Sequence, residues 1–161
     1  MKEVKGSRLA AIVGAYLGII SMANAASIVP GGSFISHGEM VVTTPSSTGA
    51  LLTCKVTVVG DVQGEIAAIS QFSVSGGPMC SMIKMKSVPL PGLVWKVDGL
   101  INGTMSNFGF STSFPINNCG PSSISVLWIS QERALRASSQ SLSGGCSLIS
   151  LKLDLPSLNV Q

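Results

Sequence analysis

Four cysteines, arranged in two similar halves, constrain this sequence more than any other feature. In the first half, Cys54 opens an alternating stretch, and a Ser-Gly-Gly turn leads to Cys80. In the second half, Cys119 precedes an alternating stretch, and a second Ser-Gly-Gly turn leads to Cys146. Another alternating run follows each closing cysteine. Apolar residues at every second position are typical of half-buried strands, so the pattern indicates two similar β units.

The cysteines predict two disulfides, for which three pairings are possible. The repeated unit favours Cys54–Cys80 and Cys119–Cys146. Each bridge would close a loop of about 25 residues and add roughly 3 kcal/mol to the free energy of unfolding. Free buried thiols or a metal site are the alternatives. Zinc is disfavoured because the chain has a single histidine and lacks a Cys-x-x-Cys motif.

The N-terminal segment has the pattern of a secretory signal peptide. Three basic residues, Lys2, Lys5 and Arg8, precede an uncharged apolar run over residues 9–22. Ala23-Asn24-Ala25 then forms a small-x-small cleavage site. The apolar run is shorter than the roughly 20 residues that a membrane-spanning helix needs.

We therefore expect residues 1–25 to be a signal peptide and residues 26–161 to form one domain with no membrane span. Cleavage after Ala26 fits nearly as well as cleavage after Ala25, and an uncleaved N-terminal anchor is the remaining alternative. An exported chain with disulfides predicts a secreted protein, with the periplasm as the second choice.

Charge is sparse in this chain. Charged residues make up 11% of the sequence, against roughly 25% in average proteins. In the predicted mature chain, seven basic residues against six acidic ones leave a net charge of +1. No basic patch indicates a nucleic-acid partner.

Short alternating segments separated by turn residues predict nine or ten strands and an all-β fold. We expect a single disulfide-stapled antiparallel β-sandwich, Ig-like or jelly-roll-like. The first strand is expected to break near Gly38, and the last to bury Ile149, Leu151, Leu153 and Leu155. Turns are expected at residues 45–49, 60–61, 102–103 and 117–121, together with an interruption at residues 89–92. The aromatic core candidates are Phe72, Trp95, Phe108, Phe110 and Trp128.

One group of residues superficially resembles a catalytic triad. Ser36, His37 and Glu39 are close in sequence, but neighbouring residues on a strand point to opposite faces. An exposed polar stretch is the better interpretation. No nucleophile-elbow motif supports a hydrolase, and we assign no catalytic residue and predict that the chain is not an enzyme.

Two further groups of residues contain side chains that can bind metal ions. Met79, Met82 and Met85 could bind copper(I), but their spacing does not match one face of a strand, and gap-filling core is favoured. Asp61 and Glu65 would make at most a weak calcium site. We therefore predict no metal, no cofactor and no cofactor-binding residue.

Several motifs together resemble one family. They are Thr53-Cys54, Leu93-Val94-Trp95, Asn118-Cys119-Gly120-Pro121-Ser122 and Leu142-Ser143-Gly144-Gly145-Cys146. In these motifs the chain is similar to the secreted alkane oxidation protein activators of the PraB type, from Gram-negative bacteria. The similarity extends over nearly the whole mature chain. Val94, at a position where proline is expected before the tryptophan, is a departure that concerns only the shape of that segment.

The resemblance implies a secreted, non-enzymatic accessory protein that promotes bacterial growth on long-chain alkanes or their uptake. Such a protein would meet a hydrocarbon or lipid surface. Residues 50–52 and 41–42 are candidate exposed apolar edges for that contact. The alternative is a structural or adhesive subunit of the cell surface, matrix or a fibre that self-associates by adding strands edge to edge.

The signal peptide can be tested directly. We expect the exported protein to begin at Ala26 or Ser27, because cleavage follows a small-x-small site. N-terminal sequencing of protein recovered from the culture medium or periplasm measures this. An intact N-terminus in the membrane fraction would contradict both the cleavage and the compartment.

Overall fold

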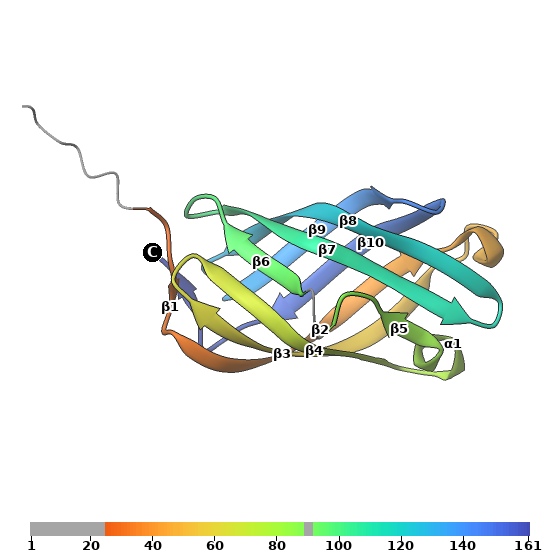
Figure 1. Ribbon diagram of the computed structural model, residues 1–161, viewed down its shortest axis with the longest axis horizontal. Coiled ribbons are helices and arrows are strands. Elements are labelled where there is room, and N and C mark those ends of the chain that lie inside the picture. The colour runs from red at the N-terminus through yellow and green to blue at the C-terminus, as the bar shows by residue number, and fades with distance from the viewer. Residues whose placement is uncertain (1–24, 89–91) are drawn as a thin grey trace, which may run out of the picture.

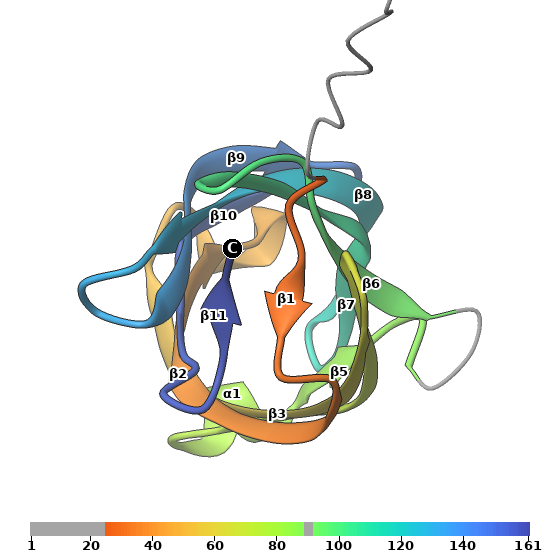
Figure 2. The same ribbon diagram turned by 90° about the vertical axis from the view of Figure 1, so that its left-hand side faces the viewer.

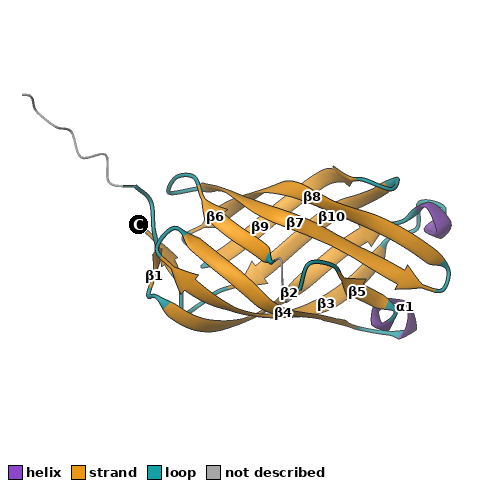
Figure 3. Cartoon of the chain, in the orientation of Figure 1, coloured by secondary structure: helices purple, strands orange, loops and turns teal. Residues whose placement is uncertain are grey.

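The computed structural model describes residues 25–88 and 92–161. The predicted signal peptide, apart from Ala25, and most of the predicted interruption at residues 89–92 lie outside the described residues. The elements, shown in Figures 1 and 3, are β1 (Ile28–Val29), β2 (Gly32–Thr43), the 3₁₀ turn η1 (Pro45–Ser47), β3 (Leu52–Gln63), β4 (Ile66–Ser75), α1 (Pro78–Ser81), β5 (Ile83–Met85), β6 (Leu93–Val97), β7 (Asn102–Ser113), β8 (Ile116–Ile129), β9 (Ala134–Leu142), β10 (Cys146–Asp154) and β11 (Asn159–Val160).

The all-β expectation is confirmed, but the sheets do not form a sandwich. Within the described residues, eight strands follow one another in the antiparallel order β2-β3-β4-β6-β7-β8-β9-β10. β10 then pairs with β2, from Asp154 opposite His37 to Ser147 opposite Thr43, and closes the sheet into a barrel (Figure 2). The sandwich prediction was wrong because an alternating pattern fixes which side chains face inward, and a barrel and a sandwich share that pattern.

The barrel interior is filled by the inward-facing side chains of all eight strands. The five predicted aromatic core residues are all buried. Trp95 and Trp128 stack with ring centroids 6.0 Å apart, and Phe72 meets Phe108 edge to face at 6.4 Å. The interior is therefore a packed core, as in other small barrels.

The close approach of β2 and β10 requires a residue without a side chain at position 38. A Cβ atom on Gly38 would lie 1.9 Å from the carbonyl oxygen of Lys152. β2 runs through Gly38 without the predicted break. A register shift in β10 between Leu148 and Ser150 also changes the expected alternation, so that Leu148 is buried in place of Ile149.

Three predicted turns were wrong. Residues 60–61 lie within β3, where Gly60 makes room for the ring of Phe34. Asn102 and Gly103 begin β7, and the turn occupies residues 98–101. Residues 117–121 belong to β8. Glycine and asparagine in these segments allow close backbone contacts within the barrel wall, so their turn preference did not decide the structure.

The two ends of the barrel differ. At one end, β1 pairs with β11 across the opening, and Ser27 and Gln161 exchange backbone hydrogen bonds (Figure 2). At the other end lie η1, α1 and the turn between β7 and β8 (Figures 1 and 3). Both disulfides, Cys54–Cys80 and Cys119–Cys146, belong to this second end. This is the pairing that the sequence repeat favours, and it joins β3 to α1 and β8 to β10.

The wall between β8 and β9 is partly bridged by a side chain. The backbone ladder between these strands covers Leu127 to Ile129 opposite Arg136 to Ala134. Beyond it, the Gln140 amide accepts a hydrogen bond from the backbone N–H of Ser125 at 2.6 Å and donates one to its carbonyl oxygen at 2.7 Å. One side-chain amide thus takes the place of a backbone partner.

Closure of the barrel depends on Gly38. We expect Gly38→Ala to lower the free energy of unfolding by about 3 kcal/mol, because the added methyl group forces the two closing strands apart. Urea denaturation of the purified protein measures this. Gly99→Ala is the matched control, because a Cβ at Gly99 meets nothing within 4 Å, and we expect a change within about 0.5 kcal/mol. Equal stability of the two variants would contradict the role of Gly38.

Candidate interaction surface

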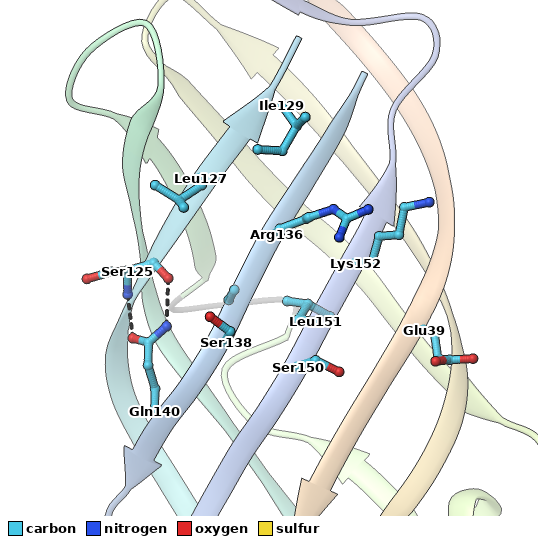
Figure 4. A pocket seen from close by; sticks show the side chains of 11 residues that line it. Glu39, Ser125, Leu127, Ile129, Arg136, Ser138, Gln140, Ser150, Leu151 and Lys152 are labelled. Carbon is cyan, nitrogen blue, oxygen red and sulfur yellow. Dashed lines mark hydrogen bonds between the residues drawn. The ribbon is translucent and has the colours of Figure 1, made fainter. Parts of the chain in front are cut away.

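A shallow groove of about 660 Å³ lies on the outer wall of the barrel (Figure 4). It crosses β8, β9, β10 and β2, and its lining mixes apolar and charged side chains. The lining residues are Glu39, Ser125, Leu127, Ile129, Arg136, Ala137, Ser138, Gln140, Ser150, Leu151 and Lys152.

The cationic groups of this groove are already paired with nearby carboxylates. Arg136 contacts Glu132 at 2.5 Å, and Lys152 contacts Asp154 at 3.1 Å. Gln140 is engaged by the backbone of Ser125. The groove therefore offers a mixed polar surface, and nothing in its lining forms a nucleophile with an oriented base.

The residues that resembled a triad lie apart. The Ser36 hydroxyl is buried and donates to the carbonyl oxygen of Asp154 at 2.9 Å. His37 is exposed, with Nδ1 3.2 Å from Oγ1 of Thr57. The alternation of side chains thus separates Ser36 from His37 as predicted. Among the described residues, no three His, Cys, Asp or Glu side chains gather in a way that could hold a metal ion.

The three methionines do not share one face. Met79 lies in α1 and is exposed, Met82 follows α1 and is half-buried, and Met85 lies in β5 and packs against the core. Met79 and Met82 line a small cavity of about 90 Å³ between α1, η1 and the β7–β8 turn.

Beside that cavity, the end of the barrel with both disulfides exposes a group of apolar side chains. Phe114 is 78% exposed and Ile116 is 85% exposed, and both flank Pro115 at the two-residue turn that joins β7 to β8. Leu51, after η1, is 60% exposed, and Met79 is 43% exposed. We call Leu51, Met79, Phe114 and Ile116 the apolar tip. Large apolar side chains gathered on an exposed end mark an interaction surface.

Buried polar groups brace the tip from beneath. The two N–H groups of the buried Asn117 amide are shared among three acceptors, namely Oγ1 of Thr112 at 2.9 Å, the carbonyl oxygen of Pro115 at 3.2 Å and Oγ of Ser46 in η1 at 2.5 Å. The Thr112 hydroxyl also donates to the carbonyl oxygen of Pro115 at 2.5 Å. These bonds hold the turn against η1, so Phe114 and Ile116 project from a firmly supported hairpin.

The disulfides hold the neighbouring segments in place. Cys54–Cys80 ties α1, which carries Met79, to the start of β3. Cys119–Cys146 ties the start of β8 to the start of β10, close to Ile116 along the chain. The conformational cost of presenting the apolar tip is therefore already met in the folded chain.

Comparison with known protein families identifies the family of this chain. It matches, over residues 1–160, the family model described as alkane oxidation protein activator PraA/PraB-like. The chain belongs to this family. Comparisons with curated proteins and with solved structures gave no match.

The family description assigns a role in activating alkane oxidation. Two disulfides indicate an oxidising compartment, extracellular or periplasmic. The described helices include none that is long and apolar enough to span a membrane.

The sequence predicted only part of the apolar tip of this activator-family chain. Of the predicted apolar edges, Leu51 is exposed, whereas Leu52 is half-buried and Val42 is fully buried. Phe114 and Ile116 were missed. The available signal was a pair of large apolar residues flanking proline, Phe-Pro-Ile, between two alternating runs.

The bracing can be separated from the exposed side chains by mutation. We expect Asn117→Ala to lower the free energy of unfolding by about 1–3 kcal/mol, because the bonds of this buried amide to Thr112, Pro115 and Ser46 are lost. Phe114→Ser and Ile116→Ser should each change it by no more than about 0.5 kcal/mol, since both side chains are exposed. Thermal and urea unfolding measure all three. A large loss from Phe114→Ser would show that this ring supports the fold.

Proposed function

We propose that the mature protein acts outside the cytoplasm as a non-enzymatic accessory of alkane oxidation, and that it contacts hydrocarbon at the oil–water interface through the apolar tip. The observation that carries the proposal is the exposure of Phe114 and Ile116 on a braced hairpin. Membership of the activator family supplies the alkane context.

The energetics favour such contact. Full burial of a Phe or Ile side chain is worth roughly 1.5–3 kcal/mol. The four side chains of the tip are exposed, and α1, which carries Met79, lies at the end of the barrel opposite β1 (Figure 1). Transfer of this end into hydrocarbon therefore gains free energy without any change in the barrel core.

A non-enzymatic role has separate support. The word activator in the family description suggests an accessory protein. The residues that could have formed a triad point to opposite sides of β2, with Ser36 held by the Asp154 carbonyl. No residue is therefore assigned to chemistry on the alkane.

Closure of the barrel disfavours the alternative function, a fibre or matrix subunit that self-associates through its strands. Strand addition needs a free sheet edge. In the described chain, eight strands of the main sheet form a closed barrel. The three-residue β5 pairs with β7 outside this barrel. The exposed tip thus favours an interfacial role over edge-to-edge assembly.

Binding of the purified mature protein to emulsified hexadecane tests the proposal. We expect the double variant Phe114→Ser with Ile116→Ser to bind at least about tenfold more weakly, because a loss of about 1.4 kcal/mol already gives that factor. The amount of protein that floats with the droplets on centrifugation measures it.

The matched control is a second double variant, Leu100→Ser with Ile101→Ser. These side chains are 62% and 59% exposed at the opposite end of the barrel, so two exposed apolar side chains, somewhat less exposed than those of the tip, are removed from a different place. We expect it to bind like the original protein. Equal loss in both double variants would show non-specific adsorption, and no droplet binding by the unaltered protein would refute the proposed function.

A further inference from the structure

We infer that the surface that receives the apolar tip is negatively charged, and specifically that it is a film of long-chain carboxylates on hydrocarbon. This inference rests on the proposed function and names the amphiphile that the same end of the barrel recognises. It is carried by two lysines beside the tip and by the distribution of acidic residues along the barrel.

Lys84 and Lys86 flank the hairpin that bears Phe114 and Ile116. β5 pairs with the far end of β7, placing Lys84 opposite Ser111, three residues before Phe114. The Lys86 ammonium donates to the side-chain oxygen of Asn118 and to the carbonyl oxygen of Gly120 at 3.0 Å. Both its partners are neutral, so its charge stays uncompensated beside the tip.

Neither lysine has an acidic partner. Among the described residues, ion pairs join Lys96 to Glu65, Arg136 to Glu132 and Lys152 to Asp154, each toward the opposite end of the barrel. Lys84 is exposed, and no carboxylate of the described chain lies within 4.0 Å of its ammonium.

The acidic residues gather away from the tip. In the described chain, the turns and strand ends near β1 and β11 carry five carboxylates, and Glu39 lies midway along β2. The five are Asp61, Glu65, Asp98, Glu132 and Asp154. The apolar end is therefore cationic, whereas the carboxylates of the far end are largely balanced by Lys96, Arg133, Arg136 and Lys152. The unbalanced positive charge at the apolar end orients the barrel toward an anionic surface.

The combination of apolar side chains with flanking lysines matches an amphiphile that has an alkyl chain and an anionic head. An alkane oxidised at its end to the acid is such a molecule, since carboxyl groups ionise well below neutral pH. The reaction that supplies it is a terminal oxidation of the hydrocarbon, which accords with the family description. Phe114 and Ile116 would enter the alkyl layer while Lys84 and Lys86 meet the carboxylates.

Droplets of defined composition test this inference. Hexadecane is emulsified alone, with oleyl alcohol or with oleate, at mildly alkaline pH, and the affinity of the mature protein is measured by flotation. We expect tighter binding to oleate droplets than to the neutral ones. The difference should shrink when salt is raised from 0.01 M to 0.15 M, because the Debye length falls from about 30 Å to about 8 Å.

Lys84→Gln is the decisive variant, since this side chain is exposed and makes no hydrogen bond or ion pair with the described residues. We expect about fivefold weaker binding to oleate droplets, the effect of one lysine near an anionic surface, and unchanged binding to pure hexadecane. Lys96→Gln removes the same charge at the opposite end and should bind oleate droplets like the original protein.

The outcomes separate the two proposals. Equal binding of the original protein to oleate and oleyl alcohol droplets, or equal loss from both lysine variants, would overturn the inference and leave the hydrocarbon contact standing. Absence of binding to every droplet would overturn the proposed function itself. Tighter binding to phosphatidylglycerol vesicles than to oleate droplets would overturn the carboxylate assignment in favour of a phospholipid membrane.

Discussion

The pairing of β2 with β10 is the interaction on which the rest of this structure depends. Every other ladder of the barrel joins strands that are consecutive along the chain, apart from β5, which lies between β4 and β6 outside the ring, and this one joins the first and last strands of the barrel. It places Gly38 against the Lys152 carbonyl, where a side chain would not fit. Once it forms, the wall has no open edge, and the apolar faces of eight strands enclose a single packed core.

Closure also explains why the exposed features of the molecule lie at its ends. The wall satisfies its own backbone groups, with Gln140 completing the weak pairing of β8 with β9. One opening is covered by β1 and β11, and the other carries the disulfides and the apolar tip. A rigid barrel with one braced apolar end suits an activator-family protein that works at a surface, because the binding end is already ordered before contact.

Local rules decide the parts of this structure that can be predicted from the sequence, and contacts distant in sequence decide the parts that cannot. Alternation identified the core faces of β3, β6 and β8, and the repeat favoured the cysteine pairing that the structure has. Turn preferences misled at Gly60 and Gly103, because both glycines lie inside strands where neighbouring groups approach closely. Phe114 and Ile116 were overlooked, since local sequence does not tell whether an apolar residue beside a turn is covered.

By itself, the amino-acid sequence determined that this chain is all-β, that its cysteines form a repeated pattern and that its charges are few. These properties follow from side-chain period and composition, which act over neighbouring residues. Only the tertiary structure decided that the sheet closes into a barrel, that Asn117 braces the β7–β8 turn against η1, and that Lys84 stands beside an exposed apolar tip. Each of these depends on segments that are apart in the sequence and meet only in the folded chain.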